Sequence, residues 1–312
     1  MSRTTIALGI ALTGLAAAVG AQSPDHSGPP PVLAITREEI KPGRMAAHEK
    51  LNAAFVAAVS RTPSRSQWLG LVPVSGDENT TLFISAFGNF AEAESQRKAD
   101  EEQSSSNAAF KAEMEALDKQ GADVHASQRT TFARYRPDLS FHPGTMEEVA
   151  QSRYFGITTV RVKYNRIPDY VDYIKTVNAA REKAGLPIKL AAYQITSGAQ
   201  AGTFLFFRPL KSLKTWDDDY ATIAETEKAM TAAYGGEEAA RKVRLQGGDI
   251  VMSADNAVYA MNPKISRPSP EFAKYDVAFW TPKPADTRSA AAAAKPGATK
   301  QPASVKQEAP KQ

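Results

Sequence analysis

The sequence contains no cysteine and, beyond its first residues, no long hydrophobic run. Without cysteine there can be no disulfide, thiol nucleophile, iron–sulfur cluster, cysteine-ligated zinc or lipid-modified cysteine. A glycine-rich phosphate loop, a nucleophile elbow and a pair of histidines at metal-ligand spacing are also lacking. These absences exclude the enzyme classes that short motifs identify, and we expect no metal ion and no cofactor.

The one apolar run lies at the N-terminus, between Ile6 and Val19. It follows Arg3, ends in small residues, and is shorter than the roughly 20 residues that span a bilayer. This pattern is typical of a secretory signal peptide, with an uncleaved anchor as the alternative. We therefore predict a signal peptide over residues 1–21 that is cleaved after Ala21. The mature chain is expected to have no membrane span and to be secreted or periplasmic.

The formal net charge of +4 does not indicate nucleic-acid binding, because it comes from the C-terminal tail. Residues 281–312 are rich in alanine, proline and lysine, and their basic residues outnumber the acidic ones by six to two. Such a segment cannot bury enough apolar surface to fold. We predict a disordered tail over 281–312, whose alternative role is weak adhesion to anionic surfaces, and a linker over 22–31. No nucleic-acid partner is expected.

Between these segments the sequence repeats itself with a shift of 122 positions. Residues 35–44 align with 157–166, 68–76 with 190–198, and 81–84 with 203–206. Hydrophobic periodicity in each copy predicts a strand, a helix, two strands, a long polar helix and a last strand. We expect the long helices to break at residues 104–106 and at Gly235-Gly236. The predicted units are 32–140 and 155–280, with a linker over 141–154.

The order β-α-β-β-α-β is that of the ferredoxin-like unit. Two such units in one chain resemble the dimeric α+β-barrel superfamily in a fused form, with a nearer likeness to the NIPSNAP-like and antibiotic-biosynthesis-monooxygenase-like groups. Short matches support this, such as Ile40-Lys41-Pro42-Gly43-Arg44 before the first helix. The resemblance implies an α+β fold of two tandem ferredoxin-like (βαββαβ) units packed sheet to sheet as a pseudo-dimeric barrel. The internal pseudo-dimer predicts a monomer.

Polar positions that differ between the copies are candidates for a ligand site. Side chains alternate along a strand, so Arg37 and Glu39 share one face with Ile35, and Arg161 occupies the equivalent face of the second copy. We expect this face to border the space between the two sheets; a solvent position or a structural ion pair is the alternative. The candidate ligand-binding residues are Arg37, Glu39, Trp68, Arg161, Gln194 and Arg208.

His48 lies on the apolar face of the first predicted helix. Haem-binding relatives of this fold can place an axial ligand there, so the resemblance makes His48 a candidate haem ligand. With one inserted residue the repeat aligns His48 with Val171, which indicates packing. We therefore expect a core histidine. Neither His125 nor His142 has a partner close in sequence.

The superfamily includes monooxygenases, isomerases, haem enzymes and proteins without known activity, so the resemblance implies architecture alone. Because no catalytic motif is present, we expect a non-catalytic exported protein that binds a small polar or anionic molecule between its sheets or acts in assembly. The alternative is a cofactor-independent monooxygenase or a haem-using enzyme of this superfamily. A closed, mostly apolar pocket with a few converging polar groups would favour an enzyme, whereas a large exposed apolar patch would favour an interaction protein.

Overall fold

The structure is a computed structural model that describes residues 28–281. The predicted signal peptide, most of the predicted linker and nearly all of the predicted tail lie outside these residues. The first unit comprises β1 (Val32–Ile40), α1 (Met45–Ser60), β2 (Leu69–Ser75), β3 (Thr80–Phe87), α2 (Phe90–Ser106), α3 (Ala108–Val124) and β4 (His125–Tyr135).

The second unit repeats this order with more helical segments. It comprises β5 (Tyr154–Val162), α5 (Ile167–Lys183), β6 (Ala191–Ser197), β7 (Thr203–Leu210), α6 (Lys214–Ala221), α7 (Ile223–Tyr234), α8 (Glu237–Ile250) and β8 (Val251–Met261). Short helices join and follow the units: α4 (Met146–Ala150), α9 (Pro270–Ala273) and α10 (Val277–Trp280). Within residues 28–281, no helix has the length and apolar character needed to cross a membrane.

The eight strands form one closed barrel in the order β1-β3-β2-β8-β5-β7-β6-β4, and every neighbouring pair is antiparallel. Each unit contributes a four-stranded ferredoxin-like sheet, so the predicted α+β fold is confirmed. The two sheets are also joined directly by hydrogen-bonded strand pairs at both edges. The last strand of each unit pairs with the hairpin strand of the other unit, β4 with β6 and β8 with β2. This closure leaves neither sheet with a free edge.

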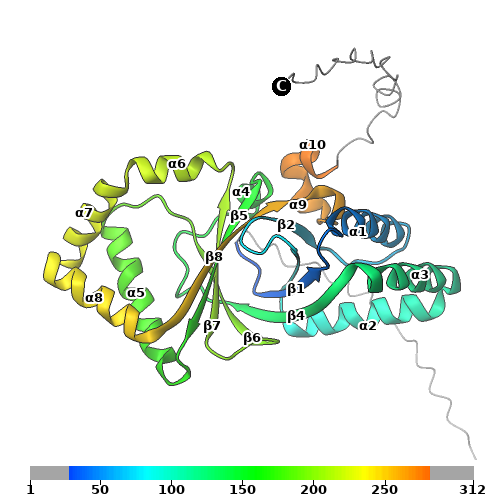
Figure 1. Ribbon diagram of the computed structural model, residues 1–312, viewed down its shortest axis with the longest axis horizontal. Coiled ribbons are helices and arrows are strands. Elements are labelled where there is room, and N and C mark those ends of the chain that lie inside the picture. Colours follow the sequence, from blue (N-terminus) through cyan, green and yellow to red (C-terminus); the bar gives the residue numbers. More distant parts are fainter. Residues whose placement is uncertain (1–27, 282–312) are drawn as a thin grey trace, which may run out of the picture.

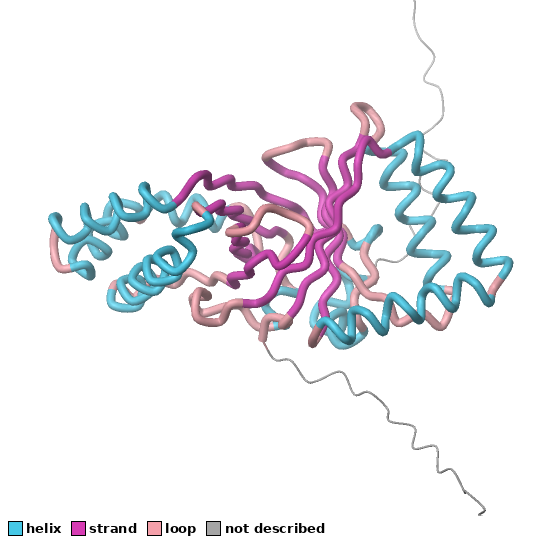
Figure 2. Tube along the Cα trace, turned by 90° about the horizontal axis from the view of Figure 1, so that it is seen from below, coloured by secondary structure: helices cyan, strands magenta, loops and turns pink. Residues whose placement is uncertain are grey.

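The helices of the two units lie on opposite sides of the barrel, α1 to α3 on one side and α5 to α8 on the other (Figures 1 and 2). Side chains alternate along each strand, so one set points into the barrel and the other lies under the helices. The inward set forms an apolar core that includes Leu33, Ile35, Leu71, Leu82, Phe155, Ile157, Leu205 and Phe207. A second apolar core lies between the sheet and the helices of the second unit.

The helix breaks have local causes. The side chain of Asn107 accepts a hydrogen bond from the backbone N–H of Phe110 and caps α3, so the long polar helix ends at Ser106. Gly235 and Gly236 have φ angles of 99° and 111°, which separate α7 from α8. The predicted break at Gly235-Gly236 is confirmed, whereas the other break lies at Asn107, directly after the predicted residues 104–106. The break between α6 and α7 at Thr222 was not predicted.

The structure corrects the alignment of the two copies at two places. Thr80 pairs with Glu39 and Thr203 pairs with Arg161, so β3 and β7 correspond with a shift of 123 positions, one more than the sequence suggested. The helices α1 and α5 begin 122 positions apart, so His48 corresponds to Tyr170 and not to Val171. A slip of one residue matters because it exchanges the two faces of a strand.

Candidate functional site

A cavity of about 290 Å³ lies inside the barrel, at the end where β1 and β5 begin. Apolar side chains from both units form its walls, and residues 28–30, α4 and α9 contribute to its lining. The Phe207 ring packs edge-on against Phe155 and Tyr193, with centroid distances of 5.7 and 5.6 Å. Leu33 and Ile84 line the same space from the first unit. A concave, mostly apolar cavity is typical of a site for a small molecule.

Few polar groups reach this cavity. The hydroxyl of Tyr193 donates to the carbonyl of Pro30 at 3.0 Å, and the indole N–H of Trp68 donates to the carbonyl of Ile265 at 2.8 Å. Burial raises the pKa of Tyr193 far above its ordinary value, so this phenol stays protonated.

Of the described residues that line the cavity, Glu92 alone carries a formal charge. It lies in the first turn of α2, where one carboxylate oxygen accepts a hydrogen bond from the backbone N–H of Gly88 at 2.7 Å. The second carboxylate oxygen has no hydrogen bond within the described residues. The cavity thus combines apolar walls, one anionic group and polar groups that are largely committed to the backbone.

The three charged residues predicted for the space between the sheets do not line this cavity. Arg37 forms an ion pair with Asp77 at 2.8 Å, Glu39 accepts a hydrogen bond from Ser127, and Arg161 is exposed. All three lie near the ends of β1 and β5, at the opposite mouth of the barrel. The prediction that the pocket includes one of them is wrong, because apolar side chains fill the barrel between the two mouths.

The other three predicted residues are also dispersed. Trp68 lines the cavity. Gln194 and Arg208 point outward, since they alternate with the inward Tyr193 and Phe207. The amide oxygen of Gln194 accepts a hydrogen bond from Arg136, and Arg208 binds both carboxylate oxygens of Asp219. The six predicted residues therefore do not form one site.

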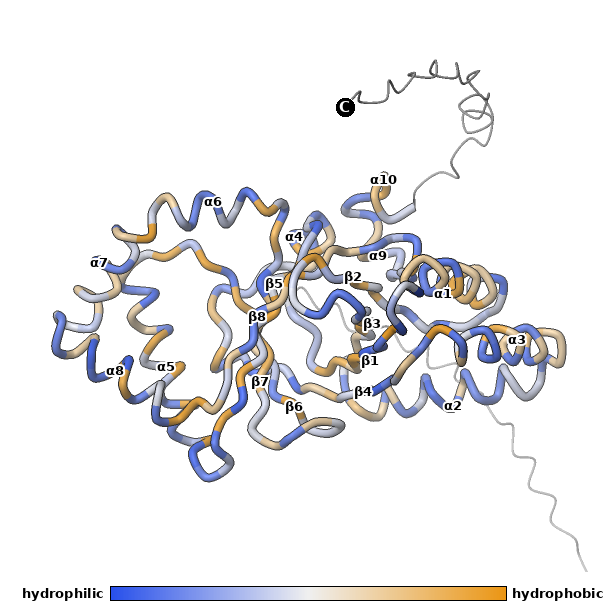
Figure 3. Tube along the Cα trace, in the orientation of Figure 1, coloured by the Kyte–Doolittle hydropathy of each residue, from blue (hydrophilic) through white to orange (hydrophobic). Residues whose placement is uncertain are grey.

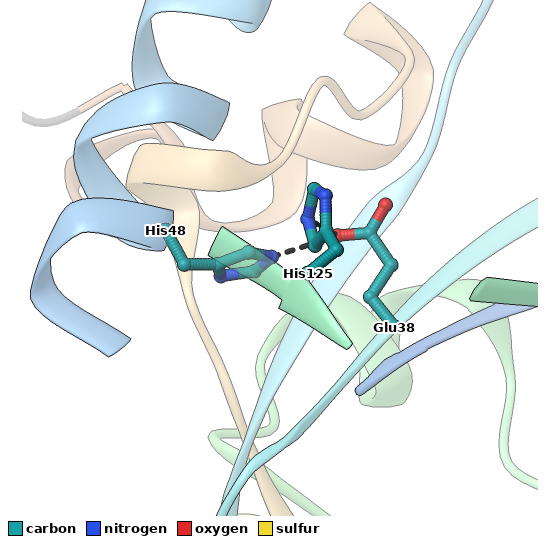
Figure 4. Close-up of side chains that lie close together, drawn as sticks. All are labelled: Glu38, His48 and His125. Atoms are coloured by element: carbon teal, nitrogen blue, oxygen red, sulfur yellow. Dashed lines mark hydrogen bonds and ion pairs between the residues drawn. The ribbon is translucent and has the colours of Figure 1, made fainter. Parts of the chain in front are cut away.

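A second polar cluster lies on the outer face of the first sheet (Figure 4). Glu38 points outward from β1, and its Oε2 lies 2.7 Å from Nε2 of His48 on α1 and 3.1 Å from Nε2 of His125 at the start of β4. Gln128 donates to the other carboxylate oxygen at 2.9 Å. His48 is 1% exposed and Glu38 is 7% exposed. A buried carboxylate is tolerated here because three side chains hydrogen-bond it.

Glu38 and its contact with His125 were missed at the sequence level. The two residues are 87 positions apart, and only the pairing of β1 with β4 brings them together. The expectation that no metal-ligand grouping exists rested on spacing along the chain, and the fold places two imidazoles and a carboxylate within 4.8 Å of one another. One sequence signal could have found Glu38: a charge on the strand face that lies under the helices needs a partner.

The surroundings of His48 do not fit a haem. Its Nε2 is hydrogen-bonded to Glu38, and its ring contacts His125 and Phe83 at centroid distances of 5.3 and 6.2 Å. An axial ligand must present a free nitrogen to an open, flat space that holds the macrocycle. His48 is fully buried among side chains and offers no such space.

No protein-family model matches the sequence, and no curated protein matches it. Solved structures match the fold. An anthrone oxidase-like protein aligns with a TM-score of 0.44 and 11% identity, over 74% of this chain and 91% of that one. A candidate monooxygenase from Lactobacillus acidophilus aligns with a TM-score of 0.43 and 7% identity, over 74% and 94%. A mutant chlorite dismutase from Candidatus Nitrospira defluvii in complex with cyanide aligns with a TM-score of 0.41 and 10% identity, over 78% and 94%. At these identities the likeness concerns the fold alone.

The expectation of a non-catalytic protein is corrected. The matched proteins carry the names of a monooxygenase, an oxidase-like protein and a dismutase, and none of these three names describes a role in binding or assembly. The names belong to those proteins, and an activity of this chain is stated below as a proposal. The cavity has the mostly apolar lining expected of an enzyme, whereas the hydroxyl of Tyr193 and the indole N–H of Trp68 are bonded to the backbone. The expected polar ligand would also find no counter-charge from Arg37 or Arg161 in that cavity.

Proposed function

We propose that the protein is an enzyme that oxidises a small aromatic molecule in the barrel cavity with molecular oxygen and without haem. The cavity itself carries the proposal: about 290 Å³ of mostly apolar space with a single carboxylate in its lining. Phe155, Phe207 and Tyr193 offer aromatic surfaces for a flat ring. Membership of the NIPSNAP-like or antibiotic-biosynthesis-monooxygenase-like group in particular remains a prediction.

In this proposal Glu92 acts as the general base. It takes a proton from an acidic C–H or O–H of the bound substrate, and the resulting anion supplies electrons to oxygen. For a ring methylene group, one oxygen atom enters the product as a carbonyl and the other leaves as water. The apolar walls exclude bulk water from the anion, and the hydrogen bond from Gly88 fixes the orientation of the carboxylate.

The test uses 1,8-dihydroxyanthrone as a probe, because its methylene carbon is acidic and its quinone product absorbs visible light. We expect the wild-type protein to accelerate oxygen uptake and quinone formation. Glu92→Gln should lower the rate about 10²- to 10⁴-fold, the usual contribution of a general base. The amide keeps an oxygen that can accept from Gly88, so the fold should be retained.

The matched control is Glu94→Gln on the same helix. Glu94 is exposed, pairs with Lys98 and does not line the cavity. Its rate should equal that of the wild type. Equal rates for Glu92→Gln and the wild type would show that Glu92 is not the general base. A product that contains no ¹⁸O after reaction with ¹⁸O₂ would exclude oxygenation.

A further inference from the structure

The duplication provides an internal comparison for the cluster of Glu38, His48 and His125. In the second unit the corresponding residues are Val160, Tyr170 and Val251. Val160 and Tyr170 belong to the apolar core between the sheet and the helices, and Val251 packs against it.

The same fold therefore packs this position with apolar side chains in one copy. Packing alone does not require a buried carboxylate and two imidazoles in the other copy, and a buried charge is costly compared with an apolar residue of similar size. One of the three helices of the first unit is polar as well: α2 is blue along much of its length in Figure 3 and has one buried residue, Ala93.

One hydrogen-bonding feature beside the cluster points to a group from outside the polypeptide. Thr81 pairs with Glu38 across β1 and β3, so both side chains lie on the same face of the sheet. Thr81 is 0% exposed, and its hydroxyl has no hydrogen-bond partner within the described part of the chain. Its counterpart in the second unit is Phe204, again an apolar core residue. A buried hydroxyl without a partner is uncommon and indicates a group that is not part of the polypeptide.

From these observations we propose that Glu38, His48 and His125 bind one divalent transition-metal ion, through Oε2 and the two Nε2 atoms. Two imidazoles and one carboxylate suit first-row ions such as Zn²⁺, Fe²⁺ and Co²⁺. The ion would replace the protons that now link Glu38 to the two histidines, and Gln128 would orient the carboxylate through its other oxygen. The His125 side chain is 24% exposed, which gives the ion a route from solvent. Three protein ligands leave further coordination positions open.

The test is a titration of the full-length, tag-free protein with Co²⁺ after treatment with a chelator. We expect one equivalent of Co²⁺ per chain, with visible d–d absorption bands, and a rise in Tm on addition of Zn²⁺ because the ion binds the folded state. His125→Val and Glu38→Gln should each weaken Co²⁺ affinity by about 100-fold or more, at least the loss seen when an outer-shell partner is removed.

Two further variants keep the result interpretable. A chain with Glu38→Val, His48→Tyr and His125→Val carries the residues that the second unit packs at these positions, so it should fold and bind no Co²⁺. His142→Gln removes a histidine that pairs with Glu182 at 2.6 Å on the surface, and it should bind Co²⁺ as the wild type does. Circular dichroism reports the fold of each variant.

The proposal is overturned if the wild type shows neither d–d bands nor a rise in Tm. It is also overturned if a folded His125→Val or Glu38→Gln variant binds Co²⁺ with unchanged affinity. Either outcome would make the cluster a hydrogen-bonded structural element. Because the readouts are binding and stability, they are independent of the oxidation proposed for the barrel cavity.

Discussion

At the scale of single residues, strand alternation decides which polar side chains can serve a site. Arg37 and Glu39 were predicted to face the space between the sheets, and they do lie on the inward face of β1 with Ile35. Their position along the strand places them at the mouth opposite the cavity. The sequence reveals the face of a residue but not the depth of the cavity, which depends on how aromatic rings from both units pack. Glu92 was missed for a different reason. A carboxylate in the first turn of a helix is favourable at the positive end of the helix dipole, so its presence there does not by itself indicate a site.

The turn after β6 offers a stability test at this scale. Gly198 has φ 86°, and a Cβ there would lie 2.3 Å from the carbonyl oxygen of Thr130 on β4. Gly185 has φ 63° and open space around it. We expect Gly185→Ala to cost roughly 1 kcal/mol, because it forces a left-handed backbone on alanine. Gly198→Ala should cost roughly 1–3 kcal/mol more, because the barrel seam must also shift.

Urea denaturation of both variants measures this difference. Equal free energies of unfolding for Gly198→Ala and Gly185→Ala would show that the seam between β4 and β6 does not approach Gly198 as closely as described.

At the scale of elements, the repeat and the hydrophobic pattern predicted the order of strands and helices. The glycine pair marked one helix break, and the serine run marked the other to within one residue. The repeat could not place the one extra residue of the second copy, which lies between β6 and β7, because short apolar matches at a shift of 122 or 123 fit the sequence equally well. The structure settles this through strand pairing: Glu39 meets Thr80 where Arg161 meets Thr203. The same pairing brings Glu38 to His125, a contact between elements far apart in the chain that no local pattern reports.

At the scale of the whole molecule, closure of the barrel creates the cavity. Four-stranded sheets from two units join through β4–β6 and β2–β8, so walls from both units surround one space. A homodimer would build such a space from two identical halves. In the fused chain, the residues that the two units contribute to the cavity can differ. The first unit supplies Leu33, Ile84 and Glu92, and the second supplies the rings of Phe155, Tyr193 and Phe207.

Export and oligomeric state are predictions that belong to this scale. We expect the exported protein to begin at Gln22. We also expect a monomer, because both edge strands of each sheet are already paired within the chain. Native mass spectrometry of exported protein measures both properties at once. A mass that still includes residues 1–21, or a dimer at micromolar concentration, would contradict this expectation.

The central claim is that an aromatic substrate binds inside the barrel, and a crystal structure of the protein soaked anaerobically with 1,8-dihydroxyanthrone tests it most directly. We predict electron density for the probe between Leu33 and Phe207, with its methylene carbon within reach of the Glu92 carboxylate. Ala191 lines the cavity, so Ala191→Met should abolish this density, whereas Ala224→Met on the exposed face of α7 should not. Density for the probe only outside the barrel, or an unchanged apolar cavity at saturating probe, would contradict the claim.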